Sequence, residues 1–312
     1  MAEHLLILSK QAARYKALLT DALPEDLRVT TCTDPDQATA GPETFTLLLA
    51  DPDLASQALP DLPCLRWLQS TWAGVRPLVE RPERHYRLTN VKGVFGPLMS
   101  EYVFAHLLAH VRKLDAQRRA QASQRWQPVA PGTLRGKTMG LLGLGSIGQH
   151  LAGTAKQFGM RTLGCARTQR PLPQVDEHYT PDQLADMVSQ ADYFVASLPS
   201  TPATRGLLDR SVLEQFKPGA LLINVGRGDL IDDAALIDSL NDGHLGGAVL
   251  DVFRQEPLPP EHPFWTTERV TLTAHTAAPS FPEDITPIFL ENLARYRAGE
   301  PLMHEVDFDR GY

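Results

Sequence analysis

The chain has 312 residues, of which 43% are hydrophobic and 21% charged, as in an ordinary globular protein long enough for two domains. Its formal net charge of −7 excludes the basic field that attracts nucleic acid or an anionic membrane surface. Three scattered cysteines (Cys32, Cys64 and Cys165) form no group that suits a structural zinc, and they fit a reducing compartment. With no leader-like start and no apolar segment near the ~20 residues of a membrane span, we expect a cytoplasmic protein without a metal.

Short apolar runs separated by polar, proline-rich breaks predict a parallel sheet with helices in the first third of the chain. The five expected strands are Leu5–Leu8, Leu27–Thr31, Thr44–Ala50, Leu65–Gln69 and Tyr86–Thr89. A long helix from about Ser100 to Gln121 should follow, because apolar residues recur there every three or four positions.

A second alternating series begins at Thr138. Its six expected strands are Met139–Gly143, Arg161–Cys165, Tyr193–Ser197, Ala220–Val225, Ala248–Val252 and Val270–Thr273. One of its helices should start with a capping box at Thr180 and Gln183, and another should end at Gly243. Pro287 should kink or shorten the last helix, Pro282–Arg297. The pattern predicts an α/β fold of two doubly wound, parallel-sheet domains, Rossmann-like or flavodoxin-like, with a cleft between them.

The segment Gly143-Leu-Gly145-Ser146-Ile147-Gly148 joins the first strand of this series to an apolar-periodic helix. In that setting the three glycines allow a tight turn, close approach of the backbone to a pyrophosphate, and packing of helix on strand. The start of the helix supplies free amides and a partial positive charge to the phosphates. A glycine-rich turn without a ligand is the alternative, and we favour a dinucleotide site.

The end of the next strand bears on the form of the dinucleotide. In proteins that bind NAD, an acidic residue about 20 positions after the glycine segment binds the ribose 2′-hydroxyl. This chain has Arg167 and Thr168 there, and its next carboxylate is Asp176. Because Arg167 and Thr168 can hold a 2′-phosphate by charge-assisted hydrogen bonds, we predict NADP(H) as the preferred cofactor and NAD(H) as the alternative.

Three later segments place polar residues directly after apolar runs, where open α/β sheets bind their ligands. Their residues of interest are Arg227, then Asp251 and Glu256, then His275. Hydride transfer to a 2-oxo acid requires a cation for the carboxylate and a proton donor for the carbonyl oxygen. An arginine suits the first task, and a histidine beside a carboxylate suits the second.

Together with the glycine segment, these motifs resemble the D-isomer-specific 2-hydroxyacid dehydrogenase family over most of the chain. Within the family the chain is most similar to the short bacterial glyoxylate/hydroxypyruvate reductases of the A type. Arg167-Thr168, Trp126-Gln-Pro128 and Arg310-Gly-Tyr312 carry that narrower resemblance. It implies that a homodimer uses NADPH to reduce a small 2-oxo acid, such as glyoxylate or hydroxypyruvate, to the D-2-hydroxy acid.

The resemblance implies a role for each site residue. Arg227 would bind the substrate carboxylate and carbonyl oxygen, His275 would be the general acid, and Glu256 would orient its imidazole. The loop Trp72-Ala73-Gly74 would also bind substrate. Two positions further on, this chain has Arg76 where the family often has an acidic residue, so we carry over no family role to Arg76. The implied cofactor-binding residues are Gly143, Gly145, Ser146, Ile147, Gly148, Arg167, Thr168, Leu198, Pro199, Thr204, Val225, Asp251 (on the nicotinamide carboxamide) and His275.

The resemblance also implies the domain plan. Residues 1–98 and 282–312 would form a discontinuous substrate domain, and residues 99–281 the dinucleotide-binding domain, with two hinge connections that allow closure. The long helix would belong to a dimer interface. Met99 would pack on the nicotinamide or lie in the core. His106 and His110 lack a third ligand, so we expect them on a helix surface or interface rather than on a metal.

Other functions remain open from the sequence. One is the dehydrogenation of a different 2-hydroxy acid, such as a larger one or phosphoglycerate, or the oxidation of formate. The missing NAD-type acid argues against the phosphoglycerate enzyme. The other is a nucleotide-sensing binding protein on the same fold, which would bind the cofactor with negligible turnover. The acidic net charge argues against that class.

Overall fold

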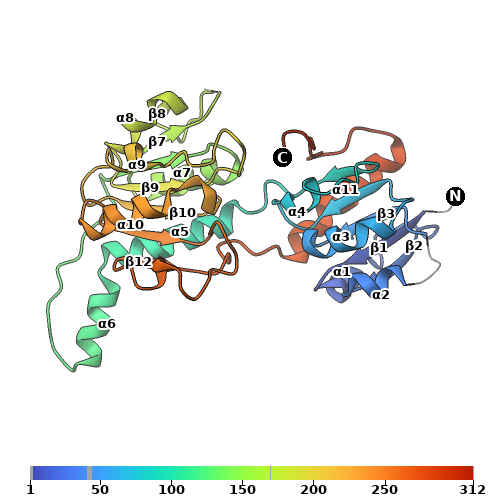
Figure 1. Ribbon diagram of the computed structural model, residues 1–312, viewed down its shortest axis with the longest axis horizontal. Coiled ribbons are helices and arrows are strands. Elements are labelled where there is room, and N and C mark those ends of the chain that lie inside the picture. The colour runs from blue at the N-terminus through green and yellow to red at the C-terminus, as the bar shows by residue number, and fades with distance from the viewer. Residues whose placement is uncertain (1–2, 41–43, 169, 312) are drawn as a thin grey trace. The chain divides into compact units, whose positions relative to one another are not determined.

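The computed structural model describes residues 3–40, 44–168 and 170–311, so Tyr312 of the C-terminal motif lies outside the described residues. The chain divides into two compact units. One comprises Met1–Val94 and Ser280–Tyr312, and the other comprises Phe95–Pro279. The boundaries expected from the sequence are residues 98 and 282. Each unit has its own parallel sheet flanked by helices (Figure 1). The predicted α/β class with two doubly wound sheets is confirmed.

The first unit contains a five-stranded sheet in the order β2-β1-β3-β4-β5. Its strands are β1 (His4–Leu8), β2 (Arg28–Cys32), β3 (Leu47–Ala50), β4 (Trp67–Ser70) and β5 (Arg87–Thr89). Its helices are α1 (Ala12–Leu19), α2 (Pro35–Thr39), α3 (Pro52–Ala58), the 3-10 helix η1 (Leu59–Asp61), α4 (Arg76–Val79) and α11 (Pro282–Ala298). Every residue of β1 and β3 is buried, because both faces of a parallel sheet are covered, and these strands therefore read as unbroken apolar runs.

The second unit contains a seven-stranded sheet in the order β12-β11-β10-β9-β6-β7-β8. Its strands are β6 (Thr138–Leu142), β7 (Arg161–Cys165), β8 (Glu177–Tyr179), β9 (Tyr193–Ala196), β10 (Leu221–Asn224), β11 (Gly247–Leu250) and β12 (Val270–Leu272). Its α-helices are α5 (Gly96–Val111), α6 (Leu114–Ala122), α7 (Ser146–Gln157), α8 (Leu184–Val188), α9 (Arg210–Leu213) and α10 (Asp233–Asn241). Its 3-10 helices are η2 (Pro181–Gln183), η3 (Gly228–Leu230) and η4 (Pro263–Trp265).

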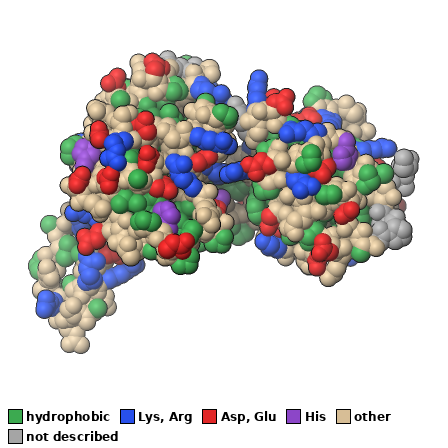
Figure 2. Space-filling model, viewed as in Figure 1, with side chains coloured by type: hydrophobic (Ala, Val, Ile, Leu, Met, Phe, Trp, Pro, Cys, Tyr) green, Lys and Arg blue, Asp and Glu red, His purple; other side chains and the backbone are tan. Residues whose placement is uncertain are grey.

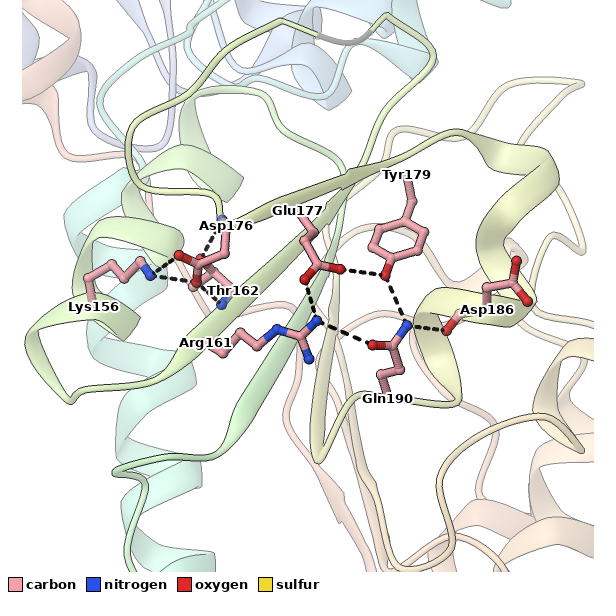
Figure 3. Close-up of polar contacts among 8 residues, drawn as sticks. All are labelled: Lys156, Arg161, Thr162, Asp176, Glu177, Tyr179, Asp186 and Gln190. Atoms are coloured by element: carbon pink, nitrogen blue, oxygen red, sulfur yellow. Dashed lines mark hydrogen bonds and ion pairs between the residues drawn. The ribbon is translucent and has the colours of Figure 1, made fainter.

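The predicted strands all occur close to their expected positions, but the sequence analysis missed β8. This edge strand has no buried residue, so it has no apolar run to reveal it. Polar contacts hold it instead (Figure 3): Arg161 of β7 pairs with Glu177, and the Tyr179 hydroxyl donates to Glu177 at 3.0 Å. Gln190 donates in turn to the Tyr179 hydroxyl at 2.9 Å.

The prediction of one helix over Ser100–Gln121 is wrong, because this stretch forms α5 and α6. Lys113 lies between them in the left-handed conformation, with φ 57°. A lysine gives no sequence signal for that conformation, which usually marks a glycine or asparagine. The helix α6 has no buried residue, and it extends away from the sheet of its unit (Figure 1).

Three smaller predictions concern helix ends. The capping box of Thr180 and Gln183 is present at the start of η2, and Gly243 follows α10 with φ 75°, so both predictions are confirmed. The helix α11 continues through Pro287 as far as Ala298, so the proline does not shorten it. Its packing within the first unit, where Phe289 stacks on Trp67 at 5.4 Å, offsets the backbone hydrogen bond lost at the proline.

The surface agrees with the modest net charge. On the face that Figure 2 shows, acidic and basic side chains are interspersed over both units. In the described part of the chain, no helix has the length and apolar content needed to cross a membrane.

Candidate active site

The predicted cofactor and catalytic residues of the second unit follow the carboxyl ends of its parallel strands, which meet at one edge of the sheet. The strand order reverses between β6 and β9, at the switch point where open α/β sheets bind ligands. Gly143 follows β6 with φ 106°, a conformation that favours glycine. A Cβ on Gly143 would lie 3.0 Å from the side chain of Leu198, which follows β9. The glycine loop and the Leu198 loop therefore lie together at the switch point.

The glycine loop fits a dinucleotide pyrophosphate. A Cβ on Gly148 would lie 2.0 Å from the Gly143 carbonyl oxygen, so only glycine lets α7 start directly against the turn. A Cβ on Gly145 would meet no atom within 4 Å, so the space outside this residue is open to a ligand. The first N–H groups of α7, at Ser146 and Ile147, have no acceptor within the helix and can serve phosphate oxygens.

Polar contacts engage the first carboxylate that follows β7 in the chain, that of Asp176 (Figure 3). Arg167 and Thr168 are exposed at the end of this strand. The Asp176 carboxylate pairs with Lys156 and accepts from the Thr162 N–H at 2.8 Å. Burial alone would raise the pKa of Asp176, but the hydrogen bonds from Lys156 and Thr162 outweigh it and lower that pKa. Asp176 is thus a structural residue that joins α7 to β7.

The loop after β9 is closed by its own hydrogen bonds. The Thr204 hydroxyl accepts from the Thr201 N–H at 2.8 Å and donates to the Pro199 carbonyl at 2.7 Å. A Cβ on Gly226 would lie 2.7 Å from the Leu198 carbonyl oxygen, so this loop packs directly on the loop that carries Arg227. Thr204 shapes the predicted cofactor loop, and its hydroxyl is already engaged within it.

The Arg227 loop follows β10 and is held by Asn224, which is 1% exposed. Asn224 donates to the Arg227 carbonyl at 2.9 Å and accepts from the Gly226 N–H at 3.1 Å. A Cβ on Gly228 would lie 2.0 Å from the Phe253 backbone, so the loop can pass this close to the next segment only with glycine there. The half-buried Arg227 is thereby brought beside the segment that contains Glu256.

His275 and Glu256 form a direct pair. The distance from His275 Nδ1 to Glu256 Oε2 is 2.8 Å, and Glu256 Oε1 accepts from the Phe253 N–H at 2.9 Å. Burial would raise the pKa of Glu256, but these two hydrogen bonds and the charge of Arg227 lower it. An ionised carboxylate only accepts, so Nδ1 carries a hydrogen. No residue in the described part of the chain bonds to Nε2, which is the ring nitrogen left for a substrate.

Asp251 fixes the turn that carries His275. It is 1% exposed, and its carboxylate accepts from the N–H groups of Thr276 at 2.9 Å and Ala277 at 3.0 Å. The His275 N–H donates to the Asp251 carbonyl at 2.8 Å. His275 has φ 54°, which costs about 1–3 kcal/mol in a residue other than glycine, and these hydrogen bonds offset that cost. The predicted contact of Asp251 with a nicotinamide carboxamide stays a prediction.

Two residues that the sequence analysis missed continue this network. The Thr273 hydroxyl donates to Asp251 at 2.5 Å and lies 2.6 Å from the Tyr102 hydroxyl. Because Thr273 has one hydroxyl hydrogen, Tyr102 must be the donor between them. Burial, with a contribution from Asp251, raises the pKa of Tyr102 to about 12, so its hydroxyl keeps that hydrogen. Thr273 begins the segment that contains His275, but its contact with Tyr102, 171 positions away in the chain, appears only in the folded protein.

The predicted substrate loop lies in the first unit, directly after β4. Trp72 and Gly74 are partly buried and Ala73 is exposed. Across residues 3–40, 44–168 and 170–311, no acceptor is found for the N–H groups of Ala73 and Gly74. Two neighbouring free N–H groups can bind an anion such as a carboxylate.

The remaining candidates lie within the second unit. Val225 is buried and Met99 is partly buried. Burial lowers the pKa of His106 and of His110, and each ring contacts a tyrosine, Tyr102 or Tyr193. Among the described residues, no group of three or more His, Cys, Asp or Glu gathers at distances that suit a metal ion.

Comparison with known proteins agrees with this geometry. Residues 104–277 match the family model described as "D-isomer specific 2-hydroxyacid dehydrogenase, NAD binding domain". Glyoxylate/hydroxypyruvate reductase A of Photorhabdus laumondii is 36% identical over 217 residues, which cover 70% of this chain and 69% of that protein.

Solved structures extend the match to nearly the whole chain. A D-isomer-specific 2-hydroxyacid dehydrogenase family protein of Aeromonas salmonicida is 43% identical, covers 99% of this chain and all of its own, and has a TM-score of 0.96. The NADPH-dependent glyoxylate/hydroxypyruvate reductase of Sinorhizobium meliloti, solved with NADP and sulfate, is 29% identical with a TM-score of 0.86, over 99% of this chain and all of its own. The predicted resemblance is confirmed, and the chain belongs to the D-isomer-specific 2-hydroxyacid dehydrogenase family.

Proposed function

We propose that the protein reduces a small 2-oxo acid, of the glyoxylate or hydroxypyruvate kind, to the D-2-hydroxy acid with NADPH. The observation that carries this proposal is the His275–Glu256 pair, held beside the Arg227 loop at the same sheet edge as the glycine loop. A reduced nicotinamide, when bound, supplies the hydride for the carbonyl carbon. The residues of the chain supply anion binding and the proton.

His275 is the proton donor in this proposal. Glu256 holds Nδ1–H and balances the charge of the imidazolium, so Nε2–H faces the carbonyl oxygen of the substrate. As hydride reaches the carbonyl carbon, the Nε2 proton passes to the oxygen and leaves a neutral imidazole, still bonded to Glu256. The C=O bond thus becomes a CH–OH group.

Two sets of donors bind the substrate anion in this proposal. The planar guanidinium of Arg227 suits the carboxylate and the carbonyl oxygen, because it presents two parallel N–H groups. The N–H groups of Ala73 and Gly74 bind the carboxylate from the backbone, where the small side chains leave them open.

The cofactor in this proposal is NADPH rather than NADH. The nearest carboxylate after β7, Asp176, is engaged by Lys156 and Thr162, so it does not repel a 2′-phosphate as a free acid would. Arg167 and Thr168 are the groups that would bind that phosphate, by charge-assisted hydrogen bonds. The Sinorhizobium reductase, with which this chain shares its fold, is described as NADPH-dependent, which supports the choice.

Initial rates with both cofactors and a panel of acids test this function. We expect NADPH oxidation with glyoxylate and hydroxypyruvate to be much faster than with bulkier 2-oxo acids. One or two charge-assisted hydrogen bonds to the 2′-phosphate should make kcat/KM for NADPH about 10- to 100-fold that for NADH. A clear preference for NADH would overturn the role of Arg167. If NADPH bound but no acid was reduced, the nucleotide-sensing function would replace the proposed one.

The proposal includes a homodimer. The side chain of Trp126 is 99% exposed, and it follows α6, which buries none of its residues within its own unit. An exposed tryptophan beside a helix with no core contact is the kind of surface that a second copy covers.

A further inference from the structure

We propose that Ser70 and Asn90 are positioning residues that aim the carboxylate-binding N–H groups of Ala73 and Gly74 by holding the carbonyls of the same peptide units. This inference rests on the proposed function, since it concerns the loop that binds the substrate carboxylate. All four residues belong to the first unit.

Ser70 sets the direction of the first N–H group. This residue ends β4 and is fully buried, and its hydroxyl donates to the Trp72 carbonyl at 2.9 Å and accepts from the Trp72 N–H at 3.0 Å. The Val91 N–H contacts the same carbonyl at 3.4 Å. In a planar trans peptide the C=O and the N–H point in opposite directions. Since the Trp72 carbonyl points into the protein, the Ala73 N–H must point outward.

Asn90 sets the direction of the second N–H group in the same way. Its side-chain amide donates to the Ala73 carbonyl at 3.0 Å, and the residue is only 3% exposed. The Ala73 carbonyl is therefore also drawn inward, so the Gly74 N–H points outward beside that of Ala73. Two neighbouring N–H groups on one side of the chain can bind the oxygens of one carboxylate.

The backbone of Asn90 is held by hydrogen bonds at both its N–H and its carbonyl group. Its N–H donates to the His304 carbonyl at 3.1 Å, and its carbonyl accepts from the Gln69 side chain at 3.1 Å. A side chain on a backbone fixed at both ends can impose its position on the loop, rather than follow the loop.

The amide oxygen of the Asn90 side chain does not stabilise the fold. Its Oδ1 is buried and has no partner among the described residues, which destabilises the fold. The bond to Ala73 is the one hydrogen bond that this side chain makes in the described part of the chain. Removal of this hydrogen bond should therefore change the conformation of the loop while it lowers the stability of the first unit only a little.

The test compares anion binding and turnover in the full-length, NADPH-loaded protein. Oxalate, a dianion that resembles a 2-oxo acid, is titrated by calorimetry into the wild type, Asn90→Leu and Ser70→Ala. Leucine keeps the branched shape of asparagine without the donor. We expect each variant to raise the Kd for oxalate and the KM for glyoxylate by about 10- to 100-fold, because the N–H groups lose their aim. The Kd for NADPH should stay within about twofold.

The controls separate positioning from general damage. Thr286→Val also removes a buried oxygen without a described partner from this unit, and it should leave the Kd for oxalate unchanged. Asn90→Ala replaces Asn90→Leu if leucine prevents folding. An unchanged Kd for oxalate in folded variants at both positions would overturn the inference, and so would a wild type that binds no oxalate. A wild type that binds oxalate but reduces no 2-oxo acid would overturn the proposed function, and the Kd comparison would still decide the inference.

Discussion

Replacing His275 with asparagine should lower kcat for glyoxylate reduction by about 10²- to 10⁴-fold, the usual contribution of a general acid. Asparagine tolerates the left-handed backbone at this position (φ 54°) better than alanine, so the turn should keep its shape. The glycine loop and Arg167 are untouched. The Kd for NADPH, measured by fluorescence titration, should therefore change by less than about twofold.

Two further variants make this result specific. His85→Ala removes an exposed histidine of the first unit and should keep wild-type kcat. Glu256→Gln should lose less activity than His275→Asn, because the imidazole stays in place but loses the carboxylate that orients it. The lowered pKa of Glu256 also means that this carboxylate is ionised above the ordinary carboxyl range, and that the stability it contributes is lost as pH falls through the lowered value. An unchanged kcat in His275→Asn would remove this residue from the chemistry.

Replacing Arg227 with lysine should lower kcat/KM for glyoxylate by about 10²- to 10³-fold, with most of the effect in KM. Lysine keeps the charge but loses the planar pair of N–H groups, so it cannot bind the carboxylate and the carbonyl oxygen together. A loss of this size corresponds to about 3–4 kcal/mol, as expected for two hydrogen bonds to a charged group. The Asn224 contacts to this loop use the backbone, so they should survive in the variant.

A matched arginine of the same unit provides the control for Arg227. Arg210 is exposed and pairs with Asp238 on the surface, at 2.6 Å, and Arg210→Lys should leave both kcat and KM unchanged. The two variants change the same chemical group in the same way, so a difference between them reports on the site. Equal KM values for glyoxylate in Arg227→Lys and the wild type would contradict the proposed role of Arg227.

The sequence was informative where one physical signal dominates a segment. Strands buried on both faces, such as β1 and β3, appear as apolar runs, and the glycines of the loop after β6 have a fixed spacing. It failed where stability comes from contacts between distant side chains. The edge strand β8 depends on Arg161 and other polar partners, and the break between α5 and α6 depends on the left-handed conformation of Lys113.

The same contrast applies within the candidate site. Arg227 and His275 could be proposed as site residues from the sequence, because each follows a strand in a recognisable motif. Asn90 could not, because it acts on Ala73 from 17 positions further along the chain, and nothing in its own neighbourhood indicates a ligand. Tyr102 acts on Thr273 across an even longer separation. Residues that position a site through three-dimensional contacts need the folded chain to identify them.

In the proposed reaction, hydride passes from NADPH to the carbonyl carbon of a 2-oxo acid, and the product is the D-2-hydroxy acid. The most direct test is the reaction of hydroxypyruvate with NADPH that carries two deuterium atoms at C4 of the nicotinamide, followed by chiral analysis and mass spectrometry of the product. We expect D-glycerate with one deuterium at C2. L-glycerate, or glycerate without deuterium at C2, would contradict it.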